Sequence, residues 1–304
     1  YNDVKNIAKA NEYYKRALEI QPDNIALSNI FASNLIHMSK FEDAKKILNS
    51  ILRQEPDNLN TLINLGVIEI ENENYELAEK LFKKSLKINP NFYRSFYNLG
   101  LLEDKKNNIE LAVKHFLKSL SLNPKHAQSH YNLGCVYQQL GKIDEAYKSF
   151  KRALDIDTNY IDAKINLSRL QLSKHEFIHG WEGYELRQGG TNKTYSILNV
   201  EKQNIWNGKK FNGELIVHGE QGLGDQVLFS SVLEELKNYC NSIKVSVDKR
   251  LVPIMQRSFK GMVFLNKMKP IQIKSNKTKN ILLGSLCQYL RKEINDFEFI
   301  DFAR

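Results

Sequence analysis

Four asparagines recur at intervals of 34 residues in the first half of the chain: Asn64, Asn98, Asn132 and Asn166. On a helix they lie opposite the apolar packing face, and their neighbours one turn away are mostly polar. A carboxamide donates and accepts hydrogen bonds, as does the backbone amide of an extended peptide. This asparagine ladder predicts an exposed groove that binds peptide backbone without reading its sequence. The alternative is that the amides bond to neighbouring helices or to water.

A second group of chemically capable residues lies in the segment HGEQGLGD, residues 218–225. It follows an apolar run and precedes residues with helical spacing. A glycine-rich turn in that place lets a ligand approach the backbone and presents the N–H groups of a helix N-terminus to negative charge. The spacing matches neither GxGxxG nor GxxxxGK[ST]. We therefore take Glu220, Gln221, Gly222 and Gly224 as candidate ligand-binding residues.

Two residues at the ends of this segment suit acid–base chemistry. Asp225, at the start of the predicted helix, is a candidate general base, and the alternative role is that of a helix N-cap. His218, at the end of the preceding strand, is a second catalytic candidate, unless it only closes the edge of a sheet. Glu220 is a candidate for orienting the loop.

The segment HEFIH, residues 175–179, fits the zinc-binding pattern HExxH. That pattern requires one continuous helix, so that both histidines face one metal ion. Here it falls in a predicted turn and the start of the following helix, and no third ligand is evident. We expect no metal site.

The elements that position these residues follow from a period of 34 residues. Prolines recur at that interval, as Pro22, Pro56, Pro90 and Pro124. The recurring small residues are Ala10, Ala44, Ala78, Ala112 and Ala146 in one register and Gly66, Gly100 and Gly134 in another. Small residues let two helices approach, with Phe82, Phe116 and Phe150 behind them, and proline ends each hairpin. A single hairpin cannot bury its apolar face, so neighbouring hairpins must stack.

This pattern resembles the tetratricopeptide repeat. We expect an α-solenoid over 1–188, with a leading helix at about 4–20. Full repeats are predicted at 25–58, 59–92, 93–126 and 127–160, and a degenerate unit at 161–188 marks a junction with another domain.

Beyond Arg187 the helical periodicity stops. A polar linker at 189–212, anchored by Trp206, leads into short apolar runs. The predicted strands are Leu215–His218, Ile243–Val247, Met262–Leu265 and Ile281–Leu283. Between the first two, the residues with helical spacing are Leu228, Val232, Leu236 and Tyr239. The alternation of strand and helix predicts an α/β lobe with a parallel sheet over 213–304.

Composition narrows the classes of partner. Residues 1–188 carry 26 Lys and Arg against 24 Asp and Glu, a net charge of +2, whereas residues 189–304 carry 18 against 11, a net charge of +7. A nearly neutral solenoid argues against nucleic acid, and the basic second half suits a phosphate-bearing ligand or only a solubilising surface. No apolar stretch is long enough to span a membrane. Three cysteines without a CxxC motif indicate a cytoplasmic protein, and the missing initial Met suggests a fragment.

Three segments in the second part carry a further resemblance: GWEGYELR at 180–187, WNG at 206–208 and HGEQGLGD at 218–225. They occur in this order in bacterial proteins that join tetratricopeptide repeats to a glycosyltransferase, similar to O-GlcNAc transferase in layout and to heptosyltransferases in the catalytic lobe. The resemblance implies a Rossmann-like, acceptor-side lobe of GT-B type. It implies a nucleotide-sugar donor, no covalently bound cofactor and no metal, with Asp225 as base and the asparagines gripping a polypeptide acceptor.

Only residues 213–304 are available for such a lobe, so we expect the donor-binding lobe to be absent and this chain alone to be inactive. The first hypothesis is a glycosyltransferase-related protein whose repeats bind an extended peptide or protein acceptor. The alternative is a non-catalytic scaffold with a vestigial α/β lobe. The sequence does not identify the sugar, the acceptor or the oligomeric state.

Overall fold

The computed structural model describes residues 2–188, 200–219, 222–266 and 277–297. It divides into two compact units, residues 1–158 and 159–304. The division precedes the predicted boundary at residue 188, because the last helical hairpin shares a core with the sheet that follows it. The two units are described separately below.

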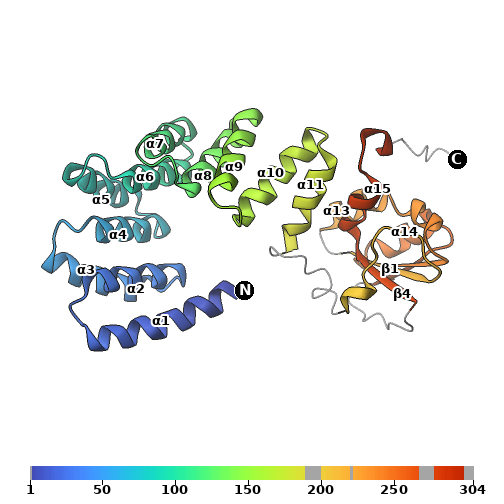
Figure 1. The fold of residues 1–304 in the computed structure, drawn as a ribbon, viewed down its shortest axis with the longest axis horizontal. Helices are drawn as coiled ribbons and strands as arrows, with labels where there is room; N and C mark the ends of the chain where they lie inside the picture. The colour runs from blue at the N-terminus through green and yellow to red at the C-terminus, as the bar shows by residue number, and fades with distance from the viewer. Residues whose placement is uncertain (1, 189–199, 220–221, 267–276, 298–304) are drawn as a thin grey trace. The chain divides into compact units, whose positions relative to one another are not determined.

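The first unit is a succession of helical hairpins preceded by one helix (Figure 1). Its helices are α1 (Asn2–Ile20), α2 (Ile25–His37), α3 (Phe41–Gln54), α4 (Leu59–Glu71), α5 (Tyr75–Ile88), α6 (Tyr93–Lys105), α7 (Ile109–Leu122), α8 (Ala127–Gln139) and α9 (Ile143–Ile156). The predicted leading helix and the four repeats from 25 to 160 are therefore confirmed in register.

Within three of the hairpins, α4–α5, α6–α7 and α8–α9, the two helices approach closely because a glycine of the first helix faces a phenylalanine of the second. A methyl group added to the glycine would lie 2.3 Å from the ring for Gly66 and Phe82, 2.6 Å for Gly100 and Phe116, and 2.6 Å for Gly134 and Phe150. The three rings are fully buried. The predicted small-residue contact is thus confirmed, and its partner is the ring sixteen residues further on.

The turn inside each hairpin repeats as well. One residue per turn has a left-handed backbone, at Ser39 (φ 57°), Glu73 (φ 61°), Asn107 (φ 62°), Gly141 (φ 71°) and His175 (φ 63°). The next residue donates its backbone N–H to the carbonyl five positions earlier, as Asn74 does to Glu69 at 2.8 Å. This is the Schellman ending of a helix, in which glycine is the preferred left-handed residue. In four of these five turns the left-handed residue is not glycine.

The second unit begins with a further hairpin, α10 (Ile161–Ser173) and α11 (Phe177–Tyr184), which continues into the 3₁₀ helix η1 (Glu185–Gln188). The indole nitrogen of Trp181 donates to the backbone oxygen of Arg291 at 2.7 Å. Phe177 and Trp181 belong to the same buried cluster as Leu215 and Val217 of the sheet. The degenerate repeat is therefore part of the hydrophobic core of the second unit.

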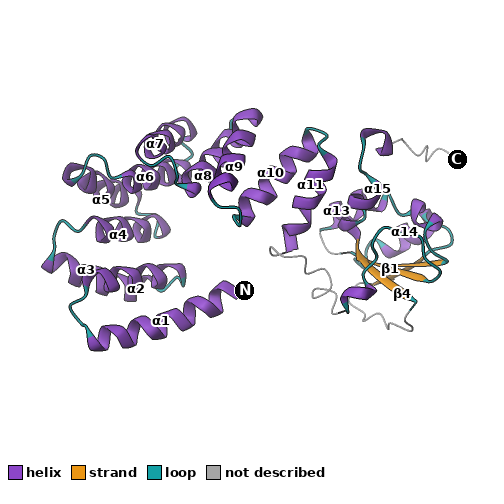
Figure 2. Cartoon of the chain, viewed as in Figure 1, coloured by secondary structure: helices purple, strands orange, loops and turns teal. Residues whose placement is uncertain are grey.

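A four-stranded sheet forms the centre of the second unit (Figure 2). Its strands are β1 (Glu214–His218), β2 (Ser242–Val247), β3 (Val263–Asn266) and β4 (Thr278–Leu282). Their order is β3-β2-β1-β4 and every pairing is parallel. Alternate strand residues enter one buried cluster with the fully buried Trp206, which confirms the predicted parallel α/β sheet and its anchor.

The connection from β1 to β2 differs from the predicted single helix. Helix α13 (Leu223–Ser230) ends early, and the 3₁₀ helix η3 (Glu234–Asn238) follows after a turn. Leu228, expected on the buried face, is 65% exposed, whereas Val232 and Leu236 are buried. The break changes which residues face the core: α13 contributes Phe229 to the buried cluster of the sheet in place of Leu228, and the second half contributes Val232 and Leu236.

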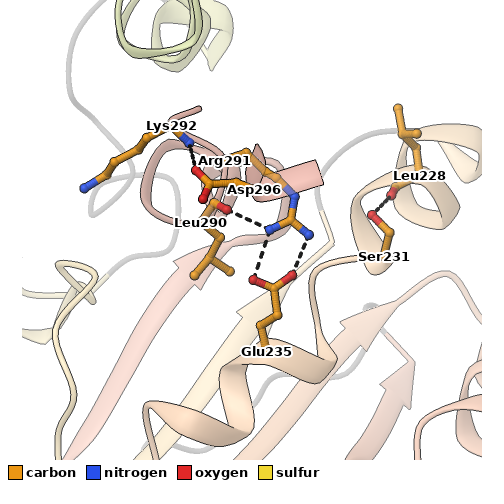
Figure 3. Close-up of polar contacts among 7 residues, drawn as sticks. All are labelled: Leu228, Ser231, Glu235, Leu290, Arg291, Lys292 and Asp296. Carbon is orange, nitrogen blue, oxygen red and sulfur yellow. Dashed lines mark hydrogen bonds and ion pairs between the residues drawn. The ribbon is translucent and has the colours of Figure 1, made fainter. Parts of the chain in front are cut away.

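Short helices complete this unit: α14 (Val252–Ser258), η4 (Leu283–Ser285) and α15 (Cys287–Leu290). Figure 3 shows how Arg291, directly after α15, faces Glu235 of η3 with both guanidinium nitrogens. A separate hydrogen bond runs from Arg187 of η1 to the hydroxyl of Ser285 in η4, at 3.2 Å. The Arg291–Glu235 ion pair thus joins the end of α15 to η3, and the Arg187–Ser285 bond joins η1 to η4. Among the described residues, no helix has the length and apolarity to cross a membrane.

Candidate functional site

The asparagine ladder is less exposed than the sequence suggests. Asn64 is 7% exposed and Asn98 only 4%, whereas Asn132 is partly buried. Their amide nitrogens are used inside the protein: Asn64 donates to the backbone oxygen of Asn29 at 3.5 Å and Asn98 to that of Arg94 at 2.7 Å. The prediction of a fully exposed face is therefore wrong for these two residues.

The amide oxygens of the same side chains remain available. Asn64, Asn98 and Asn132 accept no hydrogen bond from any described residue, and none of their oxygens is cut off from solvent. The nitrogen of Asn132 donates to the hydroxyl of Tyr97 at 3.1 Å. One N–H of each amide is used in these bonds, and each amide oxygen is left as an acceptor for an N–H group of a ligand.

Asn166, the fourth predicted rung, lies on α10 in the second unit. Its amide oxygen accepts from Arg169 at 3.3 Å. The ladder within the first unit therefore consists of Asn64, Asn98 and Asn132.

A polar pocket of about 570 Å³ opens beside Asn64. We call it the asparagine pocket, and its lining comprises Ile25, Ala26, Asn29, Ile30, Ser33, Asn34, Glu55, Asn58, Asn60, Asn64 and Arg94. These residues come from α2, α4 and α6, the first helices of three successive repeats, and from the loop before α4. The first helices of the repeats therefore form a continuous polar surface.

The walls of the pocket are held by amide hydrogen bonds. Asn29 donates to Asn58 at 3.3 Å and accepts from the hydroxyl of Thr61 at 2.9 Å. Asn58 also caps α4 by accepting from the backbone N–H of Thr61 at 3.0 Å. Each buried amide thus has a partner, so the shape of this wall is fixed before any ligand arrives.

Arg94 supplies the positive charge of the pocket. Its guanidinium donates to the side-chain oxygen of Asn60 at 2.9 Å, a neutral partner. No carboxylate of the described residues pairs with it. A guanidinium with most of its donors unused is suited to a carboxylate on a ligand.

An aromatic cluster lies beyond Arg94 along the same face. The ring of His126 packs edge-on against Tyr93 and Tyr97, with centroids 5.0 and 4.9 Å away. Burial, together with the nearby charges of Arg94 and His130, lowers the pKa of His126 to about 4. The imidazole is therefore neutral near pH 7 and adds apolar surface rather than charge.

Sequence reasoning missed Asn29, Asn58 and Asn60 as members of this site. Asn60 stands one helical turn before Asn64, just as Arg94 stands one turn before Asn98. The signal that would have found Asn60 is its position four residues before a ladder asparagine, which lies on the same helix face. Asn29 and Asn58 do not occupy such a position.

In the second unit, the glycine-rich loop leads from β1 into α13. Glu220 and Gln221 lie outside the described residues. Gly222 is the N-cap of α13, so Asp225 is the third residue of the helix and the proposed capping role of Asp225 is wrong. Asp225 is exposed.

The glycines of this loop have different reasons to be small. At Gly219 an added methyl group would lie 2.7 Å from the backbone oxygen of Ser246, so glycine is required by strand packing. At Gly224 such a methyl group would meet no atom within 4 Å, and at Gly222 it would meet only Asp225, at 3.9 Å. Packing among the described residues therefore does not explain Gly222 and Gly224, which border open space at the start of a helix.

His218 ends β1 and is partly buried. Its Nε2 lies 3.0 Å from the side-chain oxygen of Asn280 on β4. Burial lowers the pKa of His218, and this hydrogen bond acts in the opposite direction. The side chain is thus a neutral imidazole at the carboxyl end of the sheet.

The HExxH segment does not form the helix that a zinc site requires. His175 has a left-handed backbone in the turn, and α11 begins only at Phe177. His179 lies on that helix near Glu182, at 3.6 Å, with its side chain 72% exposed. Within the part of the chain that the structure describes, no three His, Cys, Asp or Glu residues gather closely enough to hold a metal ion.

The first unit thus has the architecture of a helical-repeat solenoid with a polar face built from asparagines. Family models described as tetratricopeptide repeat match residues 3–64, 35–99 and 127–160, and one described as TPR repeat matches residues 105–141. The chain belongs to the tetratricopeptide-repeat proteins.

Known proteins show the same fold. Among solved structures, PilF of Pseudomonas aeruginosa has a TM-score of 0.50 and 22% identity, covering 57% of this chain and 80% of that one. A chain of the APC/C hetero-tetramer Cut9–Hcn1 has a TM-score of 0.53 and 20% identity, covering 62% of this chain and 38% of that one. Protein FlbA of Caulobacter vibrioides is 31% identical over 87 residues, which are 26% of this chain and 14% of FlbA.

Proposed function

We propose that the first helices of the repeats bind an extended polypeptide. The observation that carries this proposal is the row of amide oxygens on Asn64, Asn98 and Asn132, which accept no hydrogen bond from the residues that the structure describes. Backbone N–H groups of an extended segment are the donors that such a row would bind without reading side chains. Repeats of this class are typical of protein–protein interaction.

The asparagine pocket gives this binding site a preference for acidic residues in the ligand. Arg94 lines a cavity whose other walls are uncharged except for Glu55, and the carboxylate of Glu55 accepts from the amide of Asn58 at 2.7 Å rather than from Arg94. Arg94 has no carboxylate partner among the described residues. A hydrogen bond to a charged group contributes about 1.5–3 kcal/mol, which is roughly a 10- to 100-fold effect on affinity. We therefore propose that the bound segment carries Asp or Glu where it passes the pocket.

Selection from a random-peptide library, with residues 1–304 as bait, tests this proposal. We expect enriched peptides to contain an acidic residue, and replacing it with the matching amide should weaken binding in fluorescence anisotropy. Arg94→Gln should abolish that difference, whereas the control Lys114→Gln, at an exposed position of α7, should preserve it. Peptides that bind equally well to both variants and show no acidic preference would contradict the role of the pocket.

A second candidate function concerns the α/β unit. We propose that it is the acceptor-side lobe of a GT-B glycosyltransferase, in which a nucleotide-sugar bound by a second lobe would donate the sugar without a metal. The support is the parallel sheet with a glycine-rich turn between β1 and α13, together with the open space beside Gly222 and Gly224. Asp225 and His218 would lie at the acceptor hydroxyl.

Nuclear magnetic resonance of residues 1–304 distinguishes this lobe from a vestigial one. Titration with methyl glycosides and with serine-containing peptides should shift the backbone amides of Gly222, Gly224 and Asp225. Gly261, which follows α14 and also meets no atom within 4 Å of an added methyl, is the control. Equal shifts at the loop and at Gly261, or none at the loop, would favour the scaffold without catalysis.

A further inference from the structure

The hydrogen bond between His218 and Asn280 joins two strands at a particular place in the sheet. In the order β3-β2-β1-β4 the chain builds outward from β1 in one direction and then adds β4 on its other side. The switch point lies between β1 and β4, and in open parallel sheets ligands bind outside the carboxyl ends of the strands at such a point. His218 is the last residue of β1, on the edge of this crevice.

Asn280 is held so firmly that its side chain has one orientation. It is fully buried, and its backbone oxygen accepts from Trp206 at 2.9 Å. Its side-chain nitrogen points at the backbone oxygen of Asn204, 3.5 Å away. A carbonyl can only accept, so the amide nitrogen must face Asn204 and the amide oxygen must face His218.

This orientation determines which nitrogen of His218 carries the proton. The amide oxygen of Asn280 can only accept, so Nε2 of His218 must donate to it, at 3.0 Å. A neutral imidazole has a single N–H, and its other nitrogen then has a free lone pair. Among the residues that the structure describes, nothing donates to Nδ1 of His218.

We infer that Asn280 is a positioning residue, which fixes His218 as the Nε2–H tautomer so that Nδ1 accepts a hydrogen bond from a hydroxyl group of a ligand at the switch point. This inference rests on the proposed acceptor-side function for the identity of the ligand, a hydroxyl-bearing acceptor. The tautomer and the accessibility of Nδ1 do not depend on that function. Burial, which keeps the imidazole neutral, preserves the lone pair near pH 7.

The tautomer can be read directly from the nitrogen shifts of residues 1–304 with labelled histidine, with His218 assigned by its loss in His218→Gln. We expect a protonated Nε2 and an unprotonated Nδ1. Asn280→Leu removes the acceptor and should yield a mixture of both tautomers. A protonated Nδ1 in the wild-type chain, or a mixture there, would overturn the inference.

Accessibility separates a ligand-facing nitrogen from a purely structural hydrogen bond. Diethyl pyrocarbonate acylates an unprotonated imidazole nitrogen, and mass spectrometry locates the adduct. We expect His218 to be modified in the wild-type chain, and at Nδ1 because Nε2 contacts Asn280. An unreactive His218 would show that Nδ1 is closed and would overturn its role as an acceptor, whether or not the chain takes part in glycosyl transfer.

Discussion

The contact between Gly100 and Phe116 sets the distance between α6 and α7, and replacing the glycine by alanine tests it. The added methyl carbon would lie 2.6, 2.7 and 2.9 Å from three carbons of the ring. The ring is fully buried and cannot swing into solvent. Overpacking of this severity costs about 2–3 kcal/mol, at the upper part of its usual range. Alanine in place of glycine recovers about 1 kcal/mol of helix propensity.

The expected net loss for Gly100→Ala is therefore about 1–2 kcal/mol. Urea unfolding followed by far-UV circular dichroism measures it. Phe116→Leu provides the matched background, because a smaller side chain leaves room for the methyl group. In that background the same alanine should be neutral or stabilising, so the double-mutant cycle gives a favourable coupling. If Gly100→Ala stabilises the wild-type chain by its full helix propensity, the ring does not set the helix distance.

Three further outcomes follow from local geometry. Glu73→Gly should stabilise the chain by about 1 kcal/mol in urea unfolding, because its left-handed backbone strains every residue with a β-carbon, and Gly141→Ala should cost a similar amount. The lowered pKa of His126 means that the unfolded chain takes up its proton first, so stability should fall as the pH drops from 6.5 towards about 4. His126 precedes α8 as Asn58 precedes α4, and Asn58 caps its helix. His126→Asn therefore keeps a capping residue, and it should reduce the dependence of stability on pH, measured by thermal unfolding at several pH values. Asp225→Asn removes a negative charge from the first turn of α13, which should lower stability by less than about 1 kcal/mol; a larger loss would indicate that the carboxylate also holds the loop in place.

The helical hairpins of the first unit were predictable because their cause is local and periodic. The glycines that pack against phenylalanines, and the prolines that end hairpins, recur every 34 residues and can be read directly from the sequence. The left-handed turns obey the same period, yet Glu73 and His175 conceal them because neither residue type signals that backbone. Only Gly141 shows the turn in the sequence.

The sites were harder to predict because they depend on contacts between distant segments. Asn64 donates to the backbone oxygen of Asn29, which lies 35 residues earlier on another helix, and the repeat pattern does not reveal this bond. The role of Asn280 requires the sheet register, since it lies 62 residues from His218. The attachment of Trp181 to the second unit spans 110 residues. Sequence spacing located the polar face of the first helices and the glycine-rich turn before α13, but it gave no information on the direction of their hydrogen bonds.

The central claim is that the amide oxygens of the repeats accept backbone N–H groups, and N-methylation of a bound peptide tests it most directly. A library-selected peptide is synthesised with one backbone amide methylated at a time, and each affinity is measured by fluorescence anisotropy. We expect certain single methylations to cost about 1 kcal/mol, roughly a 5-fold loss, and Asn98→Leu or Asn132→Leu each to abolish one of those losses. If each methylation costs the same affinity in Asn98→Leu and in Asn132→Leu as in the wild-type chain, the asparagines do not hold the backbone of the ligand.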